Sequence, residues 1–225
     1  MCGESSLIKK LRHAPVKTPR NPERPVLWIV AGPNGSGKSS LYNRTDIEGW
    51  GGSVWIINPD LLTAKIVDHE EAPAQDANLA AVQRIEAWLE ASINTYQTIG
   101  VETVLSSPKY LRIVDLAHAK GFVVRMLYVV LDSVDLQYRR VEIRVKTGGH
   151  DVPRDKIAAR RRRSFEQLAA FYDRLDDLFI FNNSAAEPGF VASKAGGTLM
   201  LSQPIPADLD QALTNAGIEM VRNPF

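Results

Sequence analysis

The residues whose types and spacing point most clearly to a chemistry occupy positions 32–39 and read Gly-Pro-Asn-Gly-Ser-Gly-Lys-Ser. They fit the pattern G-x-x-x-x-G-K-[ST], in which glycines let backbone N–H groups close around phosphate oxygens. In that pattern the lysine reaches the β- and γ-phosphates and the last hydroxyl binds Mg²⁺, which assigns the metal to Ser39. The sequence therefore predicts a site for ATP or GTP with Mg²⁺, formed by Gly32, Pro33, Asn34, Gly35, Ser36, Gly37, Lys38, Ser39 and Ser40.

The segments on either side of this loop have the character that the pattern requires. Residues 26–31 form a short β-branched and aromatic run, as expected for a strand buried on both faces. A helix is expected after the loop, and its N-terminus would add partial positive charge to the phosphate site. The alternative is a chance glycine-rich turn, which the strand before it disfavours.

Two acidic side chains are expected at the same edge of the sheet as the loop. Residues 54–57 predict a second strand that runs into Asn58, Pro59 and Asp60. Because ligands bind at the carboxyl edge of an open parallel sheet, Asp60 would face the transferred phosphate, but it could equally cap a helix that begins at Leu61. Glu102 lies in a third predicted strand, 101–105, where it should face Mg²⁺, a basic group or a bound hydroxyl, or else form a structural salt bridge.

The remaining elements follow from hydrophobic periodicity and turn residues. The pattern predicts an amphipathic helix over 75–98 with Trp88 in the core, stopped by Gly100. A strand over 122–131 ends at Asp132, which either holds Mg²⁺ through water or caps the next helix. The other predicted elements are a helix over 109–120, a strand over 178–181, a hairpin over 190–201 and a covering helix over 207–216.

Basic residues flank a glycine-rich hinge at positions 148–153. Helices are predicted before and after this hinge, an arrangement that indicates a lid. Arg144, Arg160 and Arg163 are the candidates to stabilise a transferring phosphoryl group, because planar cations suit that charge and positions 160 and 163 share a helix face. Arg161 and Arg162 are expected to be solvated or to pair with Glu166 and other acids. The alternative is a basic surface helix that contacts nucleic acid.

Length and composition bound the class of protein. The 225 residues with 44% hydrophobic content indicate one globular α/β domain, predicted over 26–225 with the lid at about 134–170. Residues 1–25 are basic and proline-rich and predict a leader that is flexible or docks. A polar start and the lack of an 18-residue apolar run argue against a secretory signal and a membrane span. The single cysteine, Cys2, favours a reducing cytoplasm, and a net charge of +1 makes nucleic acid an unlikely main partner.

Several separated segments together resemble the zeta toxin-like P-loop kinases in their small chromosomal form. The resemblance covers about 26–201 and rests on residues 31–39, 58–60, 102–106, 148–153, 160–164 and 182–184. It implies a P-loop NTPase/kinase fold: three α/β/α layers, a mostly parallel central sheet and a helical lid.

The family likeness also implies an activity. Zeta toxins use ATP or GTP to phosphorylate the 3′-hydroxyl of UDP-N-acetylglucosamine, and an antitoxin restrains the plasmid forms. By the resemblance Asp60 matches the catalytic base, and Arg144 with Arg160 or Arg163 matches the lid arginines. The residues that would bind the acceptor are Asn58, Asp60, Glu102 and Thr103. Arg161 stands where relatives often have an aromatic residue.

The sequence thus predicts a small-molecule kinase for a UDP-sugar, with an antitoxin as a further partner. Two alternatives stay open: a kinase for another hydroxyl compound such as an antibiotic, and a nucleotide-switched module that binds nucleic acid.

Overall fold

A computed structural model describes residues 24–44, 54–70, 73–147 and 152–222. Nearly all of the predicted leader and most of the predicted hinge lie outside these residues. The elements in chain order are β1 (Val26–Ala31), α2 (Lys38–Arg44), β2 (Ile56–Ile57), α3 (Pro59–Glu70), α4 (Ala74–Asn94), β3 (Ile99–Thr103), α5 (Leu111–Ala119), β4 (Val123–Val130), α6 (Val134–Lys146), α7 (Arg154–Phe171), the short 3₁₀ helix η2 (Tyr172–Arg174), β5 (Asp177–Asn182), β6 (Gly189–Ala195), β7 (Thr198–Leu201), α8 (Ala207–Asn215) and β8 (Met220–Arg222).

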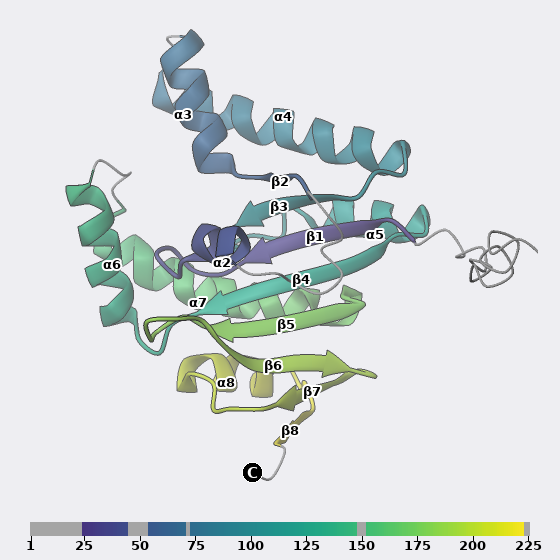
Figure 1. Ribbon diagram of the computed structural model, residues 1–225, viewed down its shortest axis with the longest axis vertical. Coiled ribbons are helices and arrows are strands. Elements are labelled where there is room, and N and C mark those ends of the chain that lie inside the picture. Colours follow the sequence, from purple (N-terminus) through teal and green to yellow (C-terminus); the bar gives the residue numbers. More distant parts are fainter. Residues whose placement is uncertain (1–23, 45–53, 71–72, 148–151, 223–225) are drawn as a thin grey trace, which may run out of the picture.

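A single sheet of eight strands in the order β2-β3-β1-β4-β5-β6-β7-β8 forms the centre of the molecule (Figure 1). The first five strands in this order pair in parallel, and β6 joins β5 and β7 antiparallel. Because β1 pairs with β3 on one side and β4 on the other, the chain changes direction across the sheet at β1. A crevice at the carboxyl end of such a strand is where open α/β sheets bind ligands.

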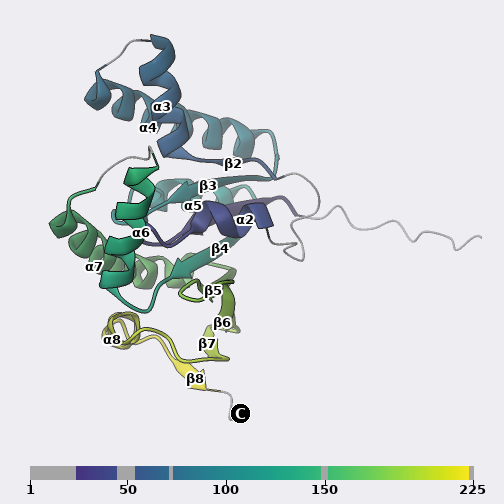
Figure 2. The ribbon, with the colours of Figure 1, turned by 60° about the vertical axis from the view of Figure 1, so that its left-hand side comes forward.

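Apolar strand residues explain how the helices cover the sheet. One face of β1, β3, β4 and β5 packs against buried residues of α4, α5, α7 and α8, including Leu89, Val114, Phe165 and Leu209. The opposite face holds a smaller cluster of Trp28, Val30 and Leu127, and α2 lies on this side (Figures 1 and 2). The predicted α/β fold with three layers and a mostly parallel sheet is therefore confirmed.

The region between the second and third strands departs from the prediction in three ways. The helix ends at Asn94, before a left-handed turn at Tyr96 (φ 56°), and Gly100 lies inside β3 instead of stopping the helix. A Cβ on Gly100 would come within 2.2 Å of the Ile56 side chain, so the glycine allows β2 and β3 to pack closely. Trp88 is not in the core: it is 41% exposed and packs against Trp55.

Candidate active site

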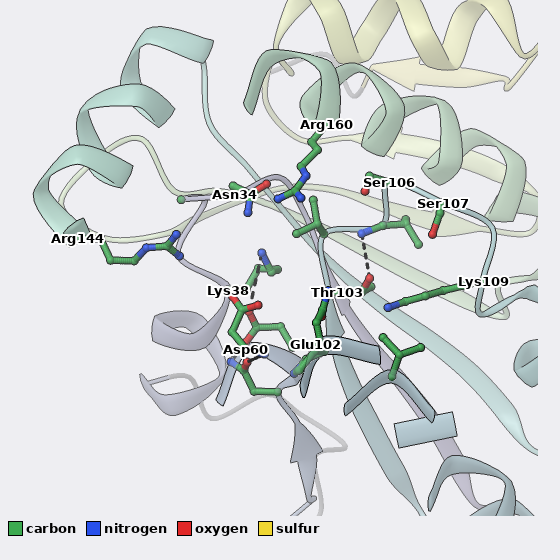
Figure 3. A pocket seen from close by; sticks show the side chains of 17 residues that line it. Asn34, Lys38, Asp60, Glu102, Thr103, Ser106, Ser107, Lys109, Arg144 and Arg160 are labelled. Carbon is green, nitrogen blue, oxygen red and sulfur yellow. Dashed lines mark hydrogen bonds and ion pairs between the residues drawn. The ribbon is translucent and has the colours of Figure 1, made fainter. Parts of the chain in front are cut away.

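The site lies where the parallel strands end at one edge of the sheet. The phosphate loop follows β1, Asn58 and Asp60 follow β2, and Glu102 and Thr103 close β3. Asn183 follows β5 at the same edge. Topology therefore brings together segments that are far apart in the sequence, as Figure 3 shows.

Two glycines of the phosphate loop hold conformations that no other residue would accept. Gly32 has φ +142°, and a Cβ there would lie 2.2 Å from the carbonyl oxygen of Val129. Gly37 has φ +86°, and a Cβ there would lie 2.2 Å from the side-chain nitrogen of Asn183. That amide of Asn183 donates to the carbonyl of Ser36 at 2.8 Å, so the end of β5 buttresses the loop.

Lys38, Ser39 and Glu102 form a compact polar group beneath the loop. The Lys38 ammonium donates to the carbonyls of Gly32 and Pro33 at 2.9 and 3.3 Å and lies 3.8 Å from Glu102. The Ser39 hydroxyl donates to Glu102 Oε2 at 2.8 Å. The expectation that Glu102 meets a basic group is confirmed, and a hydroxyl of the protein also contacts it.

Burial lowers the pKa of Lys38 below its usual value, and the charge of Arg144 lowers it further. The negative charges of Glu102 and Asp60 act against both. A phosphate group beside the loop would stabilise the charged form of Lys38, which burial disfavours, and Lys38 is therefore suited to bind an anion.

Asn58 settles how α3 begins. Its Oδ1 accepts from the backbone N–H groups of Asp60 and Leu61 at 2.9 and 3.2 Å, so Asn58 caps the helix, which starts at Pro59. The alternative that Asp60 caps a helix from Leu61 is therefore wrong. Asn58 Nδ2 also donates to Glu102 Oε2 at 2.9 Å, so one amide orients the start of α3 and the Glu102 carboxylate.

A cavity of about 210 Å³ joins the phosphate loop to Asp60 and to the segment after β3. Besides Lys38, Glu102 and Thr103, its lining includes Ser106, Ser107, Lys109, Asn78, Arg144 and Arg160. In Figure 3, Arg144 approaches from one side and Lys109 from the other. A second cavity of about 220 Å³ lies beside Gly37, Ser39, Ser40, Arg140 and Arg144.

The loop after β3 has its own supports. The Thr103 hydroxyl accepts from the backbone N–H of Leu105 at 3.0 Å, and Leu105 has a left-handed backbone with φ 55°. Ser164 of α7 donates to the carbonyl of Val104 at 2.6 Å. These contacts fix the wall of the cavity opposite the phosphate loop.

The arginines of α7 divide differently from the prediction. Arg160 lines the cavity, whereas Arg163 is exposed and is not among the lining residues. Arg161 is 2% exposed and is therefore not solvated, and it follows the other expectation by pairing with an acid, Asp208. Arg162 lies 3.8 Å from Glu166, the acid expected for it.

Asp132 is not a helix cap, because Ser133 caps α6 through a bond from the N–H of Leu136 to its hydroxyl. The Asp132 carboxylate instead accepts from Asn182 at 2.5 Å. Among the described residues no cluster of three histidine, cysteine or acidic side chains could hold a metal. Ser39 and Glu102 supply two oxygen ligands side by side, which fits a Mg²⁺ that keeps waters and binds phosphates.

Several residues of the site were not predicted from the sequence. Arg140 precedes Arg144 by one helical turn, and that i, i+4 spacing would have placed both on one face of α6. Lys109, Ser107 and Asn78 reach the cavity from segments whose sequence carries no motif, so only the folded chain brings them there.

The strand order, the loop and the arginines beside it define the class of P-loop kinases. The model of the Zeta toxin family matches residues 10–187, most of the chain. The chain therefore belongs to the zeta toxin family.

The individual proteins that this chain resembles have low sequence identity to it. An uncharacterized protein of Haemophilus influenzae is 25% identical over 146 residues, which is 61% of this chain and 98% of that protein. A chain of the PezAT chromosomal toxin-antitoxin system of Streptococcus pneumoniae is 15% identical, with a TM-score of 0.53 over 81% of this chain and 78% of its own. A chain of the AvrRxo1-ORF1:-ORF2 complex with ATP is 18% identical, with a TM-score of 0.61 over 87% of this chain, which spans 65% of that one. At these identities the likeness to the solved structures shows the fold.

No helix among residues 24–44, 54–70, 73–147 and 152–222 is long and apolar enough to span a membrane.

Proposed function

We propose that this chain is a kinase that transfers the γ-phosphoryl group of ATP to a hydroxyl of a UDP-sugar, with UDP-N-acetylglucosamine as the first candidate. The observation that carries the proposal is the position of Asp60. It lines the same cavity as Lys38 on the nucleotide side and Lys109 on the other side. Its charge also acts on both lysines, since it raises the pKa of each against the effect of burial.

In the proposed reaction Asp60 accepts the proton of the sugar hydroxyl, which makes the oxygen a better nucleophile. Lys38 and the backbone of the phosphate loop hold the β- and γ-phosphates in line with that oxygen. Mg²⁺, held by Ser39, would neutralise charge on the same phosphates. Arg144 and Arg160 line the cavity from α6 and α7 and would stabilise the charge of the transferring group.

The acceptor side of the cavity supports an anionic substrate. Lys109, together with the hydroxyls of Ser106 and Ser107, could hold a diphosphate while Thr103 lies beside the sugar. Burial lowers the pKa of Lys109, and the nearby charges of Glu86 and Asp60 only partly offset this. A bound diphosphate would stabilise its charged form.

The proposal includes a lid and a partner. Helices α6 and α7 carry the arginines and flank residues 148–151, so movement of this pair would close the cavity over both substrates. The PezAT system is described as a toxin-antitoxin system, and AvrRxo1-ORF1 is described in complex with ORF2. By analogy, an antitoxin-like protein in the cytoplasm is the proposed regulator of this chain.

The test is incubation of the purified chain with ATP, Mg²⁺ and each of a panel of acceptors, followed by mass spectrometry for an added phosphate. The panel holds UDP-N-acetylglucosamine, other UDP-sugars, free N-acetylglucosamine and aminoglycosides, with Lys38→Ala as the matched inactive control. The expected result is a phosphorylated UDP-sugar that depends on Lys38. Transfer to an aminoglycoside alone, or no transfer to any acceptor, would overturn the proposal.

A further inference from the structure

Arg161 joins three helices from a buried position. Its Nε and Nη2 donate to the two carboxylate oxygens of Asp208 at the start of α8, at 2.5 and 2.9 Å. Its Nη1 donates to Oε1 of Gln137 on α6 at 2.8 Å. The guanidinium lies 4.7 Å from the centre of the Phe165 ring. A buried arginine is stable only when its donors find such partners, and here they come from both neighbouring helices.

Gln137 carries this contact on to the phosphate loop. It is fully buried, and its Nε2 donates to the carbonyl oxygen of Asn34 at 2.9 Å. The amide therefore accepts from Arg161 with its oxygen and donates to the loop with its nitrogen. The charge of Arg161 fixes this orientation, because a flipped amide would turn its NH₂ toward the guanidinium and its oxygen toward a carbonyl.

Holding the carbonyl of Asn34 also fixes the next N–H. The peptide between Asn34 and Gly35 is planar and trans, so its N–H points opposite to the carbonyl that Gln137 holds. Gly35 lines both cavities beside the loop. A Cβ on Gly35 would lie 3.1 Å from Val141 and 3.4 Å from the carbonyl of Gln137, so α6 packs directly against this turn of the loop.

We propose that Gln137 and Arg161 are positioning residues for nucleotide binding, linked through Asp208 to the C-terminal helix. This inference rests on the proposed role of residues 32–39 as the nucleotide site. Neither residue touches the nucleotide. Instead, the chain of hydrogen bonds from Asp208 to Asn34 fixes the direction of the Gly35 N–H, which donates to the nucleotide. The affinity for nucleotide therefore depends on how α8 packs against α7.

The direct test is Gln137→Glu, which is nearly isosteric and keeps an acceptor for Arg161 but replaces the donor to Asn34 with an oxygen. We expect the Kd for ATP, measured by calorimetry without acceptor, to rise roughly 10- to 100-fold, because a buried carbonyl would face an acceptor. At saturating ATP, kcat should stay within a few fold. Arg162→Met is the matched control, since Arg162 is exposed on the next position of α7, and it should bind ATP like the wild type.

Asp208→Asn and Arg161→Lys extend the test along the same line. Each keeps a polar partner while weakening the paired contact at Arg161, so both should raise the Kd less than Gln137→Glu does. Wild-type ATP affinity in Gln137→Glu, whether or not its melting temperature falls, would overturn the inference, because the contacts would then be only structural. If the wild-type chain itself bound no ATP, the proposed function would fail as well, so the two failures are distinguishable.

Discussion

Asn58 shows how one side chain can organise two carboxylates. Its oxygen caps α3 at Asp60, and its nitrogen donates to Glu102. An aspartate could keep the cap but would place a carboxylate against Glu102, where like charges at hydrogen-bond distance repel. Asn58 therefore orients both acidic residues of the site. From the sequence alone it was only one member of a short motif.

Among single residues, Lys109 gives the most specific prediction about binding of the acceptor. Lys109→Met removes the cation from the side of the cavity proposed for the acceptor while keeping most of the side-chain volume. The KM for a UDP-sugar should rise roughly 10- to 100-fold, as expected for a lost hydrogen bond to a charged group, with the Kd for ATP unchanged. Steady-state kinetics with the acceptor varied measures this.

Lys120→Met is the control for that substitution, because Lys120 is exposed at the end of α5 and does not line the cavity. An unchanged KM in Lys109→Met would show that the cavity does not hold the diphosphate at this lysine.

At the scale of elements, the strand, loop and helix at residues 26–44 could be predicted because each rests on a local pattern. β1 has the predicted bounds, and the loop leads directly into α2. The end of α4 could not be predicted, because Tyr96 takes a left-handed conformation that its residue type disfavours. The role of Gly100 could not be predicted for a related reason: the glycine makes room for Ile56, which only the pairing of β2 with β3 reveals.

A substitution at Gly37 tests whether the conformation of the phosphate loop determines ATP binding. Gly37→Ala would bring a Cβ within 2.2 Å of Asn183 Nδ2 at a φ of +86°, so the loop must shift from its hydrogen bond to Asn183. We expect ATP binding to weaken by at least tenfold in calorimetry.

Gly121→Ala is the control that separates the effect of the steric clash at Gly37 from the effect of backbone strain at a positive φ. Gly121 has φ +80°, but no atom lies within 4 Å of a Cβ built there. That variant should lose about 1 kcal/mol of stability and keep the affinity of the wild type for ATP. Equal loss of ATP binding in both variants would show that the contact with Asn183 does not determine the affinity of the loop for ATP.

At the scale of the whole molecule, the site depends on which face each helix turns inward. The sequence placed Arg160 and Arg163 on one face of a helix but could not decide between them, because the packing of Phe165 and Leu168 into the core sets the rotation of α7. That rotation turns Arg160 to the cavity, Arg161 into the interior and Arg163 to solvent. The order of the strands likewise brings Lys109 and Asp60 to one cavity.

Arg144 tests the proposed closing of α6 over the site. Arg144→Ala should lower kcat by roughly 10²-fold with a much smaller change in the Kd for ATP, because the charge is needed mainly as the phosphoryl group moves. Arg139→Ala is the control on the same helix, where Arg139 is exposed and should be silent. A loss confined to ATP binding would assign Arg144 a role in the ground state and count against the lid.

The proposed activation of the acceptor hydroxyl by Asp60 can be measured as the single-turnover rate of Asp60→Asn with ATP and UDP-N-acetylglucosamine. The amide keeps the size of the side chain but lacks the basicity to accept a proton, and Asn58 still caps α3. We expect transfer to be slower by roughly 10²- to 10⁴-fold, with the Kd for ATP and the melting temperature nearly unchanged. A rate close to that of the wild type would show that Asp60 is not the base.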